Sequence, residues 1–190
     1  MIKQDVISMT LTVLALTIFL YSATWPGELA THALFVSVLG VAGMVMSFLI
    51  GGFRRDKEID RVEQGQIISY TALGLGVIFA ANMMVSMVPK VGSISVVDEK
   101  LFLILIAIME EQFFRGFLAT FFYQRGGMLV GVLGSAAIFT VYHFAVYGSN
   151  PAALAVVFVA GCVLAWIDLR AQRVTPSMIA HILNNMLVVV

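Results

Sequence analysis

Charged residues are scarce in this sequence of 190 residues, since Lys, Arg, Asp and Glu make up 12% of it and hydrophobic residues 61%. A soluble domain of this size needs more polar surface than that to cover its core. The 11 basic residues are matched by 11 acidic ones, so the chain lacks the excess of positive charge that is typical of nucleic-acid binding. The composition therefore predicts a polytopic membrane protein with no nucleic-acid partner.

Cysteine is almost absent, because the sequence contains only Cys162, in an apolar run. A single cysteine excludes a disulfide bond within the chain. No charged or histidine residue beside it would activate it as a nucleophile, so we interpret Cys162 as a buried structural thiol. Internal repeats and low-complexity tracts are also lacking, which predicts one domain over residues 1–190.

Long apolar runs are what the sequence has in abundance. Each is close to the ~20 residues that a helix needs to cross a bilayer, and they cover residues 5–25, 31–53, 66–89, 101–124, 128–148, 151–169 and 175–190. Asn150-Pro151 and Thr175-Pro176 place a capping residue before a proline, as at a helix start. Gly126-Gly127 separates the fourth run from the fifth. The predicted fold is all-α, a polytopic transmembrane bundle of about seven helices.

Basic residues outside the apolar runs are unevenly distributed. With the N-terminus inside, eight lie on the cytoplasmic side and two on the other, namely Lys3, Arg54, Arg55, Lys57, Arg61, Arg125, Arg170 and Arg173 against Lys90 and Lys100. Cytoplasmic loops carry an excess of such residues. We therefore expect an integral membrane protein with a cytoplasmic N-terminus, and the compact chain without a signal sequence favours a prokaryotic cell membrane.

The fourth apolar run contains three charged residues, Glu110, Glu111 and Arg115. A charge at the centre of a membrane helix costs about 2.5 to 3.5 kcal/mol on insertion scales. Glu111 and Arg115 are four residues apart, so they share a helix face and can form an ion pair. Glu110 is rotated by about 100° from Glu111 and points elsewhere. An ion pair with Arg115 therefore explains the charge of Glu111 in this apolar run but not that of Glu110.

Polar residues also occur in two later runs. The fifth contains His143, with Phe139 one turn before it on the same face, and the seventh contains His181 and Asn185, again four apart. Taken singly, each has a structural interpretation; an asparagine between helices contributes on the order of 0.6 kcal/mol. Together with Glu110, these groups can satisfy one another in a dry interior only by converging. Such a cluster indicates an active site or an ion path.

Three short motifs lie in order along these runs, EEQFFR (110–115), FTVYH (139–143) and HILNN (181–185). They match the patterns EExxxR, FxxxH and HxxxN. In this combination the sequence resembles the CAAX-protease and bacteriocin-processing family, also called the Abi family, whose best-known members are the type II CAAX prenyl endoproteases. The resemblance covers residues 101–190, which would be the catalytic core, with 1–100 as accessory membrane helices.

The resemblance implies an intramembrane glutamic protease that forms no acyl-enzyme. In this family the first glutamate of EExxxR and the histidine of FxxxH activate a water, and these are Glu110 and His143 here. The HxxxN residues, His181 and Asn185, would form the oxyanion hole. The supporting residues would be Glu111, Arg115 and Phe139. The implied substrate is a peptide or protein held in the lipid bilayer, prenylated or carrying a sorting tag, and cut near its end.

Other functions remain open at this stage. Zinc could bind Glu110, His143 and His181, like the ligands of zinc peptidases, but the chain has no HExxH motif, and we favour a metal-independent enzyme without a cofactor. A non-catalytic member of the same family could act in bacteriocin immunity. An ion or proton carrier also needs carboxylates and histidines at mid-depth, although no inverted repeat is present.

Two further features have a structural interpretation. Gly40 and Gly43, in the second run, would allow a close approach between helices. Asp168 and Arg170 close the sixth run, where we expect a solvated helix end.

Overall fold

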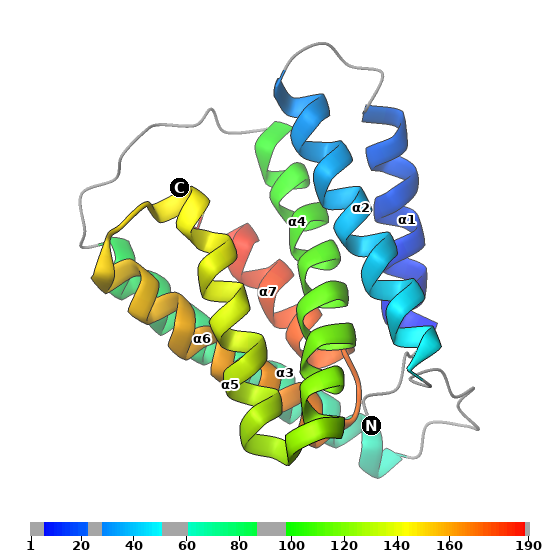
Figure 1. The fold of residues 1–190 in the computed structure, drawn as a ribbon, viewed down its shortest axis with the longest axis vertical. Coiled ribbons are helices and arrows are strands. Elements are labelled where there is room, and N and C mark those ends of the chain that lie inside the picture. The colour runs from blue at the N-terminus through cyan, green and yellow to red at the C-terminus, as the bar shows by residue number, and fades with distance from the viewer. Residues whose placement is uncertain (1–5, 23–27, 51–60, 87–97, 189–190) are drawn as a thin grey trace.

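The computed structural model describes residues 6–22, 28–50, 61–86 and 98–188, and nearly all of these residues are helical (Figure 1). In chain order these are the α-helices α1 (Val6–Ser22), α2 (Glu28–Leu49), α3 (Arg61–Ser86) and α4 (Asp98–Glu111), the π-helix η1 (Gln112–Ala119), and the α-helices α5 (Thr120–Tyr147), α6 (Pro151–Ala171) and α7 (Thr175–Val188). Within the described ranges there is no β-strand, which confirms the all-α prediction.

Apolar helices dominate the structure. Two helical stretches are long and apolar enough to cross a bilayer, Phe102–Phe144 and Pro151–Ala171. Many large apolar side chains lie on the outside of the bundle, among them Ile68, Leu129 and Val141, which are 69%, 69% and 73% exposed. An apolar exterior of this kind suits lipid rather than water. The membrane character is therefore confirmed, whereas seven crossings remain a prediction.

The predicted orientation depends largely on residues outside the described ranges, namely Lys3, Arg54, Arg55, Lys57 and Lys90. A cytoplasmic N-terminus therefore stays a prediction. The division into accessory residues 1–100 and a catalytic core 101–190 is likewise not tested by the fold.

The chain reverses direction at Gly127, inside the expected Gly126-Gly127 break. Gly127 has φ 74° and ψ −167°, a conformation that residues with a Cβ atom rarely adopt. Figure 1 shows the chain running along α4, turning at one end of the bundle and returning along α5. This reversal brings residues of α4 and η1 opposite residues of the returning limb.

Helices α6 and α7 begin where the prolines predict. The side-chain oxygen of Asn150 accepts hydrogen bonds from the backbone N–H groups of Ala152 and Ala153, at 3.1 and 3.2 Å, and thereby caps α6. Helix α7 begins at Thr175, directly before Pro176. It packs against both α3 and α4, so its polar residues can face the charged residues of the fourth run.

Helix α2 approaches the π-helix closely at Gly43. A Cβ atom there would lie 2.7 Å from Cα of Phe113 and 2.9 Å from the carbonyl carbon of Gln112. Both are backbone atoms, which cannot swing aside as a flexible side chain can. At Gly40 the neighbour is the side chain of Met109. The close approach predicted for these glycines is therefore present, and it braces the chain on either side of Glu110.

Gly43→Ala is expected to destabilise the protein by about 1 to 3 kcal/mol, because the added methyl group must displace the backbone of η1. Thermal unfolding in detergent micelles measures the change. Gly76→Ala in α3 is the matched control, since no atom lies within 4 Å of its Cβ position. Equal unfolding temperatures for the two variants would contradict the close packing of α2 on η1.

Candidate active site

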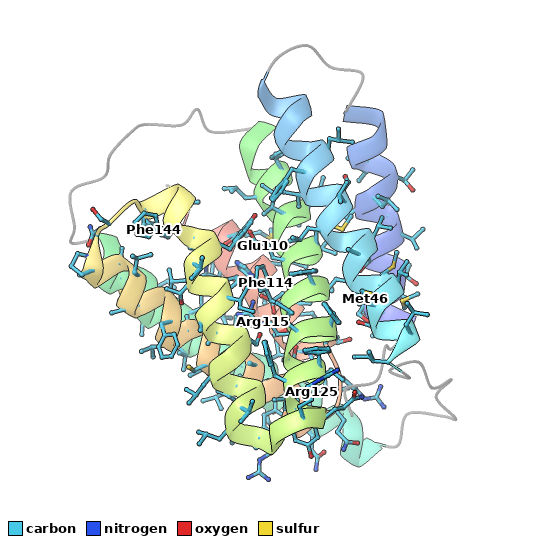
Figure 2. The ribbon with its side chains drawn as sticks, in the orientation of Figure 1. Met46, Glu110, Phe114, Arg115, Arg125 and Phe144 are labelled. Atoms are coloured by element: carbon cyan, nitrogen blue, oxygen red, sulfur yellow. The ribbon has the colours of Figure 1, made fainter. Side chains whose placement is uncertain are left out.

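The charged residues of the fourth run lie inside the helix bundle. Figure 2 shows Glu110, Phe114 and Arg115 on the side of α4 and η1 that faces α5 and α7. The relative exposure is 5% for Glu110, 0% for Glu111 and 0% for Arg115. Burial among polar partners inside the bundle therefore offsets the free-energy cost of these charges in a membrane.

Glu111 and Arg115 form the ion pair that their spacing predicts. Nε of Arg115 lies 3.2 Å from Oε2 of Glu111, and neither side chain is exposed. The guanidinium carbon also lies 4.1 Å from the ring centroid of Phe139, in cation–π contact. Within the described part of the chain, no hydrogen-bond acceptor reaches Nη1 or Nη2 of Arg115. The arginine therefore depends on Glu111 and Phe139.

Glu111 has a second partner on α7. Its Oε1 lies 2.8 Å from Nδ1 of His181, and the side chain of Ser177 interacts with the same carboxylate. An ionised carboxylate can only accept, so Nδ1 of His181 is the donor and Nε2 faces away from Glu111. One carboxylate thus connects Arg115 of η1 with His181 of α7 and fixes the histidine ring.

Glu110 points to a different set of residues. Its Oε2 lies 4.0 Å from Nε2 of His181, its carboxylate hydrogen-bonds with the side chain of Tyr142, and it interacts electrostatically with His143. The surroundings of Glu110 are therefore two imidazoles and a phenol, without the arginine. This separation of the two glutamates agrees with their expected rotation about the helix axis.

His143 is held by its own helix and by aromatic rings. Its Nδ1 lies 2.9 Å from the carbonyl oxygen of Phe139. A carbonyl oxygen can only accept, so Nδ1 carries the hydrogen and Nε2 of the neutral ring carries the lone pair. The ring lies 4.2 Å from that of Phe139 and stacks on Tyr147 at 6.1 Å and 14° between planes. Both contacts restrict how the imidazole can turn.

Asn185 lies one turn beyond His181 on α7. Its Nδ2 donates to the carbonyl oxygen of Leu103 at 3.0 Å, and its Oδ1 accepts from Asn184 at 3.3 Å. An amide NH₂ group has two hydrogens, and the bond to Leu103 uses one of them. Asn185 therefore anchors α7 on α4 and retains one donor.

The solvated helix end predicted at Asp168 is wrong, because this side chain is fully buried. Its Oδ1 accepts a hydrogen bond from the backbone N–H of Ser177 at 3.1 Å, and its Oδ2 contacts the Ser177 hydroxyl. The start of α7 covers the end of α6 at this point. Arg170 is exposed, so the expectation holds for that residue.

The structure thus brings together the motif residues Glu110, Glu111, Arg115, Phe139, His143 and His181, whereas Asn185 contacts Leu103 of α4 and its neighbour Asn184. The sequence did not predict that four further side chains interact with these residues, namely Tyr142, Tyr147, Asp168 and Ser177. Tyr147 is four residues after His143 and Ser177 four before His181, so helical spacing could have found them.

Metal binding is a separate question for the same residues. Across the ranges that the structure describes, no group of three or more His, Cys, Asp and Glu side chains is arranged to hold a metal ion. The nearest approach of His181 and Glu110, 4.0 Å, is also wider than the roughly 3.3 Å between neighbouring ligands of a tetrahedral zinc with bonds of 2.0 Å.

One protein-family comparison gives a match. Residues 94–187 match the family model described as type II CAAX prenyl endopeptidase Rce1-like. The matched stretch includes all three motifs and ends within α7. Comparisons with curated proteins and with solved structures give no match.

Proposed function

Since residues 94–187 of this chain belong to the type II CAAX prenyl endopeptidase Rce1-like family, we propose that the protein is an intramembrane glutamic endopeptidase. It hydrolyses a peptide bond near the end of a membrane-associated substrate. The observation that carries this proposal is the separation of the glutamates: Glu111 is paired with Arg115, whereas Glu110 faces two histidines.

Glu110 and His143 activate the attacking water. Arg115 is paired with Glu111, so the carboxylate of Glu110 is not held in an ion pair with it. Nε2 of His143 carries a lone pair. Both groups can therefore accept a hydrogen bond from a water between them. The carboxylate takes one proton from the water as the oxygen attacks the scissile carbonyl carbon. The same proton then passes to the leaving amine when the carbon–nitrogen bond breaks. Because water and not a side chain attacks the carbonyl carbon, no acyl-enzyme forms.

His181 and Asn185 stabilise the negative oxygen that develops on the attacked carbonyl. The Nε2 edge of His181 faces Glu110, and Asn185 keeps one amide hydrogen that Leu103 does not use. Donors that are held in place before the reaction are worth about 10²- to 10³-fold in rate each. Glu111 accepts the Nδ1 hydrogen of His181 at 2.8 Å, so His181 donates to the negative oxygen from Nε2 as the doubly protonated imidazolium, which Glu111 holds in place.

Arg115 and Phe139 support the site without touching the substrate. Arg115 neutralises Glu111, and Phe139 lies against both the guanidinium group and the ring of His143. The position of Glu111, and hence of His181, therefore depends on two residues from different helices.

The proposed activity is tested with purified protein in lipid vesicles and a panel of membrane-anchored peptides. The panel contains one peptide sequence with a prenyl group, an acyl chain or a transmembrane helix as the anchor, and the same peptide without an anchor. Mass spectrometry of the products should show cleavage near the end of at least one anchored peptide and none of the free peptide. Vesicles without protein are the control, and an intact panel would contradict the proposal.

Chelators are expected to leave the cleavage rate unchanged, because the proposed mechanism uses only side chains and water. The rate is measured in 1,10-phenanthroline or EDTA, after removal of metal ions and with zinc added back. Loss of activity on chelation and recovery with zinc would favour the alternative in which Glu110, His143 and His181 hold the metal ion.

A further inference from the structure

Asp168 lies at the end of α6 and belongs to none of the three motifs. Its carboxylate is fully buried and accepts from both the backbone N–H and the hydroxyl group of Ser177. A buried carboxylate needs such donors in place of water. The two contacts fasten the end of α6 to the first turn of α7, which is the helix that carries His181 and Asn185.

Ser177 begins a line of polar residues along α7. His181 and Asn185 follow at intervals of four, so the three side chains lie on one face of the helix. His181 donates to Glu111 at 2.8 Å, and the Ser177 side chain lies close enough to interact with the same carboxylate. Asn185 donates to a backbone carbonyl of α4 at 3.0 Å. Successive turns of α7 are thus held by α4, and Asp168 of α6 holds the first of these turns.

Asp168 also belongs to the buried charge cluster of the site. It interacts electrostatically with Glu111 and Arg115, and all three side chains are fully buried. A cap at a solvated helix end needs only to satisfy the first amide groups of its helix. Asp168 does that for α7 and also holds the hydroxyl group of Ser177, a side chain that interacts with the carboxylate of Glu111.

We infer that Asp168 is a positioning residue for peptide hydrolysis and acts through Ser177, an inference that rests on the proposed function. Ser177 lies between the carboxylates of Asp168 and Glu111 and one turn before His181. A shift of Ser177 therefore reaches the His181 ring by two routes, along the helix and through Glu111. The quantity that Asp168 controls is the approach of His181 to Glu110, 4.0 Å between Nε2 and Oε2.

The test compares kcat and KM of Ser177→Ala, Ser177→Thr and Asp168→Asn with those of the wild type. Ser177→Ala is expected to lower kcat by about 10- to 100-fold, since small misplacements of a catalytic group cost that much, with KM unchanged. Ser177→Thr keeps the hydroxyl group and should restore most of kcat. Asp168→Asn keeps one oxygen that can accept from the Ser177 N–H. Its kcat should therefore lie between those of Ser177→Ala and Ser177→Thr. Ser69→Ala is the matched control, because Ser69 is an exposed serine of α3 whose hydroxyl donates to the Gly65 carbonyl at 2.9 Å.

A second measurement follows the histidine directly. The chain has three histidines, so ring-¹⁵N spectra can be assigned by single substitutions, and Ser177→Ala should move the His181 signals more than those of His143. Thermal unfolding of every variant accompanies both measurements. The inference is overturned if Ser177→Ala keeps the kcat of Ser69→Ala, or if both Ser177→Ala and Asp168→Asn lose activity only in proportion to unfolded protein. Full activity of Glu110→Gln in the same assay would instead overturn the proposed function, and the inference with it.

Discussion

Glu110→Gln is expected to reduce peptide cleavage by about 10³-fold or more, the upper part of the range for removal of a general base. Glutamine has nearly the same shape as glutamate, but its amide cannot take a proton from the attacking water. Stability should change little, because the ion pair with Arg115 belongs to Glu111 and not to Glu110. The amide oxygen of the variant can still accept the hydrogen bond from Tyr142.

The measurement is a cleavage rate per folded molecule, with thermal unfolding and membrane insertion recorded for the same preparation. Glu63→Gln is the matched control, since it makes the same chemical change in α3, outside residues 94–187. A Glu110→Gln rate equal to that of Glu63→Gln would exclude catalysis by Glu110. It would favour a non-catalytic role such as bacteriocin immunity.

Arg115→Ala is expected to harm stability and activity together. The substitution leaves Glu111 as a buried charge without its cation, and breaking one partner of a buried pair costs about 3 to 5 kcal/mol. It also removes the group that packs 4.1 Å from the ring centroid of Phe139. Activity should fall as well, because Glu111 then no longer holds His181 in one orientation. Chemical unfolding in micelles and the cleavage rate measure the two effects.

Arg125→Ala is the matched control for this substitution. Arg125 is exposed and its guanidinium carbon lies 3.4 Å from the ring centroid of Phe121, a contact worth about 0.5 to 1 kcal/mol at an exposed site. Replacing both charges, in Glu111→Gln with Arg115→Met, should regain much of the stability, because no lone charge remains. A loss of stability no larger for Arg115→Ala than for Arg125→Ala would contradict the buried ion pair.

The ion pair and the convergence of the motifs could be predicted from the sequence because both follow from local rules. Residues four apart share a helix face, which gave the Glu111–Arg115 pair, and polar groups in an apolar interior must find one another. The break at Gly127 and the start of α6 at Pro151 follow equally from the backbone preferences of glycine and proline. The distance of 4.0 Å between Nε2 of His181 and Oε2 of Glu110, by contrast, could be obtained only from the structure.

Features that depend on packing between distant segments could not be predicted. The buried state of Asp168 results from α7 covering the end of α6, and nothing near Asp168 in the sequence distinguishes it from a solvated helix end. The π-helix at Gln112–Ala119 is similar, since the periodicity of an apolar run does not separate it from an α-helix. Helices of this kind are frequent at functional sites, and here it carries Arg115 and begins directly after Glu111.

The most direct test of a water activated by Glu110 is the mass spectrum of products formed from an anchored peptide in H₂¹⁸O. The wild-type protein is predicted to give two fragments, with a heavy oxygen atom in the carboxylate of the new C-terminus, and Glu110→Gln to leave the peptide intact. An intact peptide after incubation with the wild type, or as much labelled fragment from Glu110→Gln as from the wild type, would contradict the mechanism.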